Sequence, residues 1–201
     1  MVGIGLTVLL GACAPSGSPP KPAQAAGSES LSTPSAQVSS SPAPGVQAFS
    51  IGSAVTDTIG GYLPDGRTVT PFDVQNPVIG WIDPALLMAI QNAARSAAAD
   101  GIDMRITSGW RTKGFQQRLF NDAVRMYGSK DIAQQYVASP DTSRHVLGKA
   151  VDVGPAEADK WLISNGSRFG LCQIYANEIW HFELAADHGG QCPPLLANAA
   201  G

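Results

Sequence analysis

The chain has 201 residues, of which 14% are charged, with a formal net charge of -3 and a pI near 5.5. This acidic balance argues against a nucleic-acid partner, because such proteins usually carry a basic patch. The stretch from about residue 51 to 192 has the size of one ordinary domain, and the sequence contains no internal repeat or Gly-rich phosphate loop.

Residues 1–12 form a short apolar segment that ends in Leu-Gly-Ala before Cys13. The segment is shorter than the roughly 20 apolar residues of a membrane span and is typical of a signal peptide. The run into Cys13 resembles the lipobox of bacterial lipoproteins, in which this cysteine becomes the lipid-bearing first residue. No Lys or Arg precedes the apolar core. An upstream start, or Cys13 as an ordinary signal-peptide residue, therefore stays open.

Residues 13–50 are rich in Pro, Ser, Ala and Gly, and Lys21 and Glu29 are their only charged residues. Such a segment cannot bury a core, so we expect a disordered tether. With a lipid on Cys13, the tether would hold a domain of residues 51–192 outside the bacterial cell membrane. Without the lipid, the protein would be secreted. Residues 193–201 are expected to be a C-terminal tail.

Two long helices are expected in this domain. Asp83 is expected to cap a helix that begins at Pro84, and the apolar stripe of this helix runs to Gly101. A second helix follows Thr112 and stops at Gly128. The apolar face of this second helix is expected to consist of Phe115, Leu119, Ala123 and Met126.

Four short strands complete the prediction. Along the last of them, side chains alternate between the two faces, which places Trp180, Phe182 and Leu184 on one face and His181 on the other. Helices before and between strands that look antiparallel argue for an α+β domain. The strands are expected at residues 104–107, 149–153, 171–175 and 179–184, and two shorter helices at 131–137 and 157–164.

Three cysteines are present. If Cys13 carries a lipid, Cys172 and Cys192 remain as an even pair. A disulfide between them would attach the C-terminal tail to the strand near residue 172. The alternative is two buried free thiols.

His145, Asp152 and His181 form a candidate zinc site, and Glu178 stands three residues before the second histidine. A catalytic zinc typically has three His or carboxylate ligands and keeps its fourth position for water, whose pKa falls to about 7. Gly148 is where the chain can turn so that the first histidine and the aspartate face one site. An isolated His–Asp pair is usually a surface hydrogen bond, but this ordered spacing favours a metal site.

These residues can support amide hydrolysis. Glu178 can act as general base and pass the proton to the leaving amine. Arg111, in a Ser-Gly turn after a predicted strand, can neutralise charge on the carbonyl oxygen or hold a terminal carboxylate. Glu183 is interpreted as a surface carboxylate that shares the face of His181 and can contact that ligand.

The chain resembles the VanY-like D-alanyl-D-alanine carboxypeptidases, zinc peptidases of bacterial cell-wall metabolism. The likeness runs from Ser-Gly-Trp-Arg, ending at Arg111, through Ser-x-His to Glu-Ile-Trp-His-Phe, and covers most of residues 78–185. Trp110 replaces the family's usual tyrosine, and Asp141 stands where glycine commonly precedes Thr-Ser. The resemblance implies a small, mainly antiparallel sheet flanked by helices with zinc in a cleft, the hedgehog/D-Ala-D-Ala-peptidase-like fold.

The resemblance also implies roles for individual residues. It assigns one zinc ion to His145, Asp152 and His181, the general base to Glu178, and oxyanion and substrate binding to Arg111. Two further positions, Ser143 and Gln116, would help to bind the peptide.

We therefore expect a monomeric zinc D-alanyl-D-alanine carboxypeptidase that acts on peptidoglycan stem peptides. One alternative is an endopeptidase of the same fold, which would cut inside the stem peptide or cross-link. The other is a zinc-containing lipoprotein that binds the cell wall without catalysis. Three ligands leave an open position, whereas a closed structural zinc usually has four protein ligands.

Overall fold

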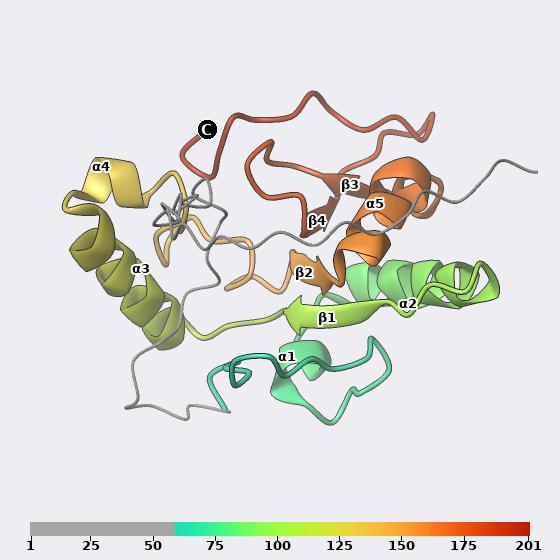
Figure 1. Ribbon diagram of the computed structural model, residues 1–201, viewed down its shortest axis with the longest axis horizontal. Coiled ribbons are helices and arrows are strands. Elements are labelled where there is room, and N and C mark those ends of the chain that lie inside the picture. The colour runs from blue at the N-terminus through green and yellow to red at the C-terminus, as the bar shows by residue number, and fades with distance from the viewer. Residues whose placement is uncertain (1–58) are drawn as a thin grey trace, which may run out of the picture. The chain divides into compact units, whose positions relative to one another are not determined.

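The computed structural model describes residues 59–201 and contains one four-stranded antiparallel sheet with helices around it (Figure 1). The order of the strands is β1-β2-β4-β3, which confirms the expected α+β class. The predicted signal peptide, Cys13, the tether and residues 51–58 lie outside the described residues. The strands are β1 Arg105–Ser108, β2 Val151–Gly154, β3 Leu171–Gln173 and β4 His181–Leu184. The helices are α1 Pro77–Gly80, α2 Pro84–Ala99, α3 Lys113–Tyr127, α4 Lys130–Ala133, α5 Ala156–Asn165 and the short 3-10 helix η1 Gly166–Phe169.

The two long helices begin and end where their capping residues predict. The Asp83 carboxylate accepts a hydrogen bond from the backbone N–H of Ala85 at 2.9 Å, which satisfies a free donor in the first turn of α2. Thr112 caps α3 in the same way, and Gly128 ends it in the left-handed conformation with φ +78°. Both predicted helices are thereby confirmed.

The four strands and α5 lie where they were predicted, with ends that differ by no more than two residues, and the remaining elements differ more. The helix expected at residues 131–137 ends at Ala133, after which the chain continues in turns. Met126, placed on the buried face of α3, is 60% exposed, so this assignment was wrong. Tyr127, the next residue of α3, packs against the buried cluster in its place. The short helices α1 and η1 were not predicted.

The main core lies between one face of the sheet and the helices α2 and α5. Phe182 of β4 and Val151 and Val153 of β2 are buried in this core. A second cluster joins α3 to the segment after it, and Figure 1 shows α3 and α4 together at the opposite end from α2 and α5. The opposite face of β2 and β4 therefore carries the polar side chains, as the alternation predicted.

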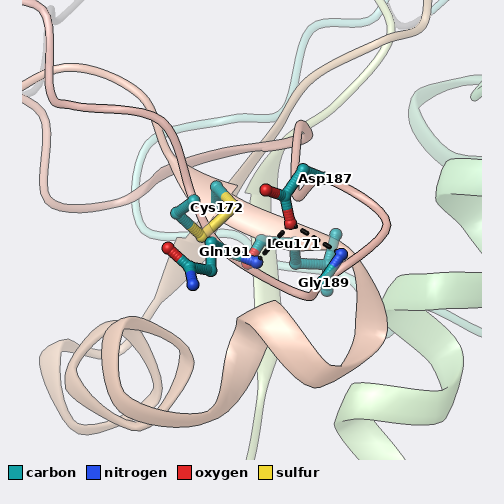
Figure 2. Close-up of a disulfide and its surroundings, with 6 residues drawn as sticks. Leu171, Cys172, Asp187, Gly189 and Gln191 are labelled. Carbon is teal, nitrogen blue, oxygen red and sulfur yellow. Dashed lines mark hydrogen bonds between the residues drawn. A yellow bond between two sulfur atoms is a disulfide. The ribbon is translucent and has the colours of Figure 1, made fainter.

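The disulfide expected between Cys172 and Cys192 is present and attaches the end of the chain to β3 (Figure 2). Beyond it, the backbone N–H of Leu196 donates to the carbonyl of Ile174 at 2.9 Å, and that of Ala176 donates back to Leu196 at 2.8 Å. The segment predicted as a tail is thus paired with the domain. Within residues 59–201, no helix combines the length and apolar character needed to cross a membrane.

Removing this disulfide is expected to lower the free energy of unfolding by about 3 kcal/mol, because the bond closes a loop of 20 residues in the unfolded chain. Urea unfolding of Cys192→Ser would measure the loss. Both proteins would carry Cys13→Ser, which removes the third thiol, and the one that keeps Cys192 is the reference. An unchanged unfolding midpoint would show that the bond adds nothing to stability.

Candidate metal centre and active site

A cavity of about 540 Å³ opens above the polar face of the sheet. Its wall includes every described residue to which the sequence analysis gave a catalytic, metal-binding or substrate-binding role. These residues are Arg111, Gln116, Ser143, His145, Asp152, Glu178 and His181.

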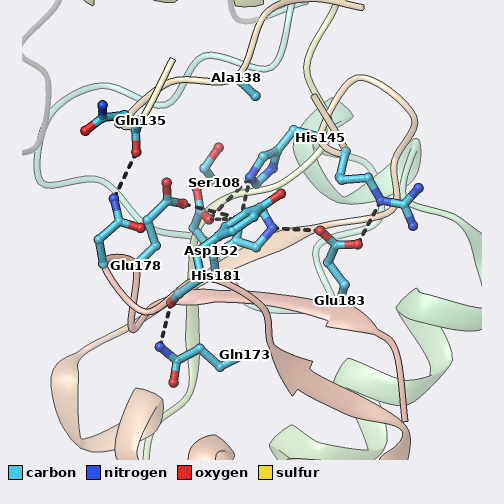
Figure 3. Close-up of polar contacts among 12 residues, drawn as sticks. Ser108, Gln135, Ala138, His145, Asp152, Gln173, Glu178, His181 and Glu183 are labelled. Carbon is cyan, nitrogen blue, oxygen red and sulfur yellow. Dashed lines mark hydrogen bonds and ion pairs between the residues drawn. The ribbon is translucent and has the colours of Figure 1, made fainter. Parts of the chain in front are cut away.

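Three ligand atoms meet in this cavity, as Figure 3 shows. The His145 Nε2 and His181 Nδ1 atoms are 3.3 Å apart, and each lies 3.3 Å from Asp152 Oδ1. Ligands about 2.0–2.1 Å from a tetrahedral ion lie about 3.3–3.4 Å from one another. All three side chains are buried. The spacing and the donor types, two imidazoles and a carboxylate, therefore fit Zn²⁺.

The backbone explains why these side chains converge. β2 and β4 pair so that Asp152 lies directly opposite His181. His145 reaches them from a turn that ends at Gly148, which has φ +67°. A Cβ atom at this glycine would lie 2.5 Å from the carbonyl oxygen of Trp81, so a larger residue would both strain and crowd the turn. The predicted turn at this glycine is confirmed.

A second layer of contacts orients both imidazoles. The His145 Nδ1–H donates to the carbonyl of Gly109 at 2.8 Å, which leaves Nε2 free to bind a metal. The His181 Nε2–H donates to Glu183 at 3.1 Å, and Arg144 donates to the other oxygen of that carboxylate at 2.7 Å. This arrangement likewise leaves His181 Nδ1 free.

The prediction for Glu183 was partly wrong. Its expected contact with His181 is confirmed, but the residue is only 6% exposed and is not a surface carboxylate. The role of Arg144 was not predicted. The adjacent letters Ser-Arg-His were the one available signal, and they do not reveal a partner 39 positions away.

The Arg111 guanidinium is held beside the ligand atoms. Its Nη2–H donates to Asp152 Oδ2 at 3.0 Å, and its Nε–H donates to Ser108 Oγ at 2.9 Å. Gln116 accepts from Nη1 at 3.1 Å and donates to the carbonyl of Ala138 at 2.8 Å. These contacts place Gln116 as a support for the arginine, while the remaining guanidinium N–H groups can serve a ligand in the cavity.

The carboxyl groups of the site differ sharply in their pKa. Burial and then the charge of Asp152 raise the pKa of Glu178 to about 7, which suits a group that exchanges protons near neutral pH. Burial would also raise the pKa of Asp152. His145, His181 and Arg111 outweigh that effect and hold it far below its usual range. Glu178 Oε2 lies 3.7 Å from His181 Nδ1, outside the triangle of ligand atoms.

Comparison with known proteins gives a family match over residues 81–187, more than half of the chain, to the model described as VanY: D-alanyl-D-alanine carboxypeptidase. A D-alanyl-D-alanine carboxypeptidase of Enterococcus faecalis is 32% identical in an alignment of 126 positions, and the match covers 50% of this chain and 47% of that protein. The chain thus spans about half the length of this curated relative.

Solved structures include similar chains. VanYB in complex with D-alanine-D-alanine has 30% sequence identity and a TM-score of 0.50, covering 55% of this chain and 79% of that one. A mutant of the vancomycin-resistance D,D-pentapeptidase VanY in complex with Zn(II) has 31% identity and a TM-score of 0.48, covering 51% and 71%. With a family match over more than half of its length, the chain belongs to the VanY family of D-alanyl-D-alanine carboxypeptidases.

Proposed function

We propose that this protein is a zinc-dependent D-alanyl-D-alanine carboxypeptidase that removes the terminal D-alanine from peptidoglycan stem peptides. The observation that carries the proposal is the buried triangle of ligand atoms with Glu178 and Arg111 beside it in one cavity. Family membership supports it, as does a structural relative whose ligand is D-alanine-D-alanine.

His145, Asp152 and His181 would hold the zinc ion. When bound, zinc supplies Lewis acidity, which polarises a carbonyl and lowers the pKa of water. The three residues already carry the spacing and the free nitrogen atoms that such an ion needs. Side chains of the cavity wall would carry out proton transfer, charge stabilisation and peptide binding.

Glu178 would take the proton from the attacking water and deliver it to the leaving amine. Its raised pKa near 7 lets the carboxyl accept and release a proton with little energetic cost. The free N–H groups of Arg111 would stabilise the charge on the scissile carbonyl oxygen or bind the terminal carboxylate of the peptide. The Ser143 Oγ is buried in the cavity wall without a hydrogen-bond partner among residues 59–201, so it is available to bind the peptide.

The proposal includes an extracytoplasmic location. The apolar segment before Cys13 and the Pro/Ser-rich stretch that follows support a lipid anchor and a domain tethered to the membrane surface. The family acts on peptidoglycan, and this substrate lies outside the cytoplasm.

Mass spectrometry of the reaction products tests the function. The purified chain, loaded with zinc, is incubated with a stem pentapeptide ending in D-alanyl-D-alanine and, separately, with cross-linked muropeptides. Loss of one alanine that stops after chelation of the metal is the expected result. Fragments from an internal bond would establish an endopeptidase instead. Zinc binding without cleavage of either substrate would contradict the hydrolase assignment and favour a binding role.

Glu183→Ala is expected to weaken zinc binding by about 10- to 100-fold, because His181 loses the carboxylate that orients its ring and makes it more basic. Competition against a chromophoric chelator would measure the affinity. Glu157→Ala removes an exposed carboxylate and should leave it unchanged. Equal affinities of both variants and wild type would show that Glu183 does not orient the ligand.

A further inference from the structure

Buried polar atoms without a partner gather in one place. Among residues 59–201, the side-chain atoms that are buried and lack a hydrogen bond are Ser143 Oγ, Asn177 Oδ1 and Asp159 Oδ1. All three residues line the cavity that contains the candidate metal centre. A buried unpaired polar atom costs about 1–3 kcal/mol and usually marks a place for a ligand or an ordered water.

Asp159 stands apart from the other two because it carries a charge and because the chemistry described above does not use it. The chain runs from Asp152 in β2 through Gly154, where the strand ends, into the first turns of α5, and Asp159 lines the same cavity. The residue is 5% exposed, so its carboxylate has little bulk water to solvate it.

Neighbouring charges make it costly to leave the Asp159 carboxylate buried without a partner. Two of them, those of Asp152 and Glu157, are negative, and a zinc ion bound to Asp152 would offset the first. Burial and these two neighbours raise the pKa of Asp159 to about 6, so the side chain is mostly ionised at neutral pH. A cation with N–H donors in the cavity would supply the missing hydrogen bond and a compensating positive charge.

We propose that Asp159 forms a subsite for a primary ammonium group carried by the peptide substrate. The inference rests on the proposed peptidase function and adds a determinant of substrate choice to it. An ammonium group supplies a positive charge and several N–H donors, which match an unpaired carboxylate. A substrate carboxylate would be repelled here.

A second metal ion fits the position less well. The group of His, Cys, Asp and Glu residues that could hold an ion within residues 59–201 consists of His145, Asp152 and His181, and Asp159 does not belong to it. A single carboxylate is too few ligands for a divalent cation, whereas it is sufficient for an ammonium group.

The test compares peptides that end in lysyl-D-alanyl-D-alanine, with the lysine side chain and the peptide N-terminus each either free or acetylated. Wild type is expected to favour one free amine by about tenfold or more in kcat/KM, the worth of a charged hydrogen bond. The four peptides show whether that amine is the side chain or the N-terminus. Asp159→Asn should abolish the preference, so that the variant uses all four peptides with similar kcat/KM.

Glu157→Gln is the matched control, because it removes a negative charge from the same helix at an exposed position. It should keep the preference for the free amine. Retention of the full preference by Asp159→Asn, or equal use of all four peptides by wild type, would overturn the subsite.

Binding gives a readout that does not depend on turnover. In zinc-loaded Glu178→Gln, calorimetry should show the same preference of about tenfold or more for the free amine, and adding Asp159→Asn should remove it. Binding with this preference but no hydrolysis by wild type would reject the proposed function and keep the subsite. Hydrolysis without the preference would keep the proposed function and reject the subsite.

Discussion

Replacing Glu178 by glutamine is expected to lower kcat by about 10²- to 10⁴-fold, the usual contribution of a positioned general acid–base group. The carboxyl lies beside His181 but outside the triangle of ligand atoms, so the metal should still bind. Glutamine keeps the size of the side chain and cannot accept the proton. Kinetics on a D-alanyl-D-alanine peptide, together with a zinc titration of the same preparation, would measure both effects.

Glu157→Gln makes the same chemical change on the exposed surface of α5 and should retain wild-type kcat. If Glu178→Gln kept kcat within a few-fold of wild type, Glu178 would not be the general base. Loss of zinc from this variant would instead make Glu178 part of the metal centre.

Arg111→Lys is expected to lower kcat/KM by about 10²- to 10³-fold, as removal of one oxyanion donor typically does. The substitution keeps the charge but loses the planar fork that contacts Asp152, Ser108 and Gln116 at once. A lysine ammonium cannot keep these contacts and also reach the substrate. Steady-state kinetics would measure the change, with circular dichroism to confirm the fold.

Arg105→Lys is a suitable control, because Arg105 lies on β1 at the edge of the sheet and its side chain contacts Thr68 on the surface. Its kcat/KM should match wild type. An Arg111→Lys variant with wild-type kcat/KM would show that charge alone is sufficient and that the fork has no role.

The sequence predicted what depends on local pattern. Capping residues such as Asp83 and Thr112 located the starts of the long helices, because the bonds that satisfy the first turn come from residues within three positions. Alternation in β4 separated His181 from the buried Phe182 for the same reason. The three candidate ligands were found because their types and order are distinctive.

Contacts over long separations escaped prediction. Arg144 and Glu183 are 39 positions apart, and Gln116 contacts the carbonyl of Ala138 from 22 positions away. Neither pairing leaves a periodic signal, since each depends on how α3 and the turn before β2 settle against the sheet. The unpartnered carboxylate of Asp159 is equally invisible in sequence, because only the fold buries it.

An anomalous diffraction experiment at the zinc absorption edge, on crystals of the zinc-loaded chain, tests the metal centre most directly. One peak is expected at bonding distance from His145 Nε2, Asp152 Oδ1 and His181 Nδ1, with the fourth position facing the cavity and Glu178 nearby but unbound. A peak elsewhere, or a fourth protein ligand that closes the site, would contradict it.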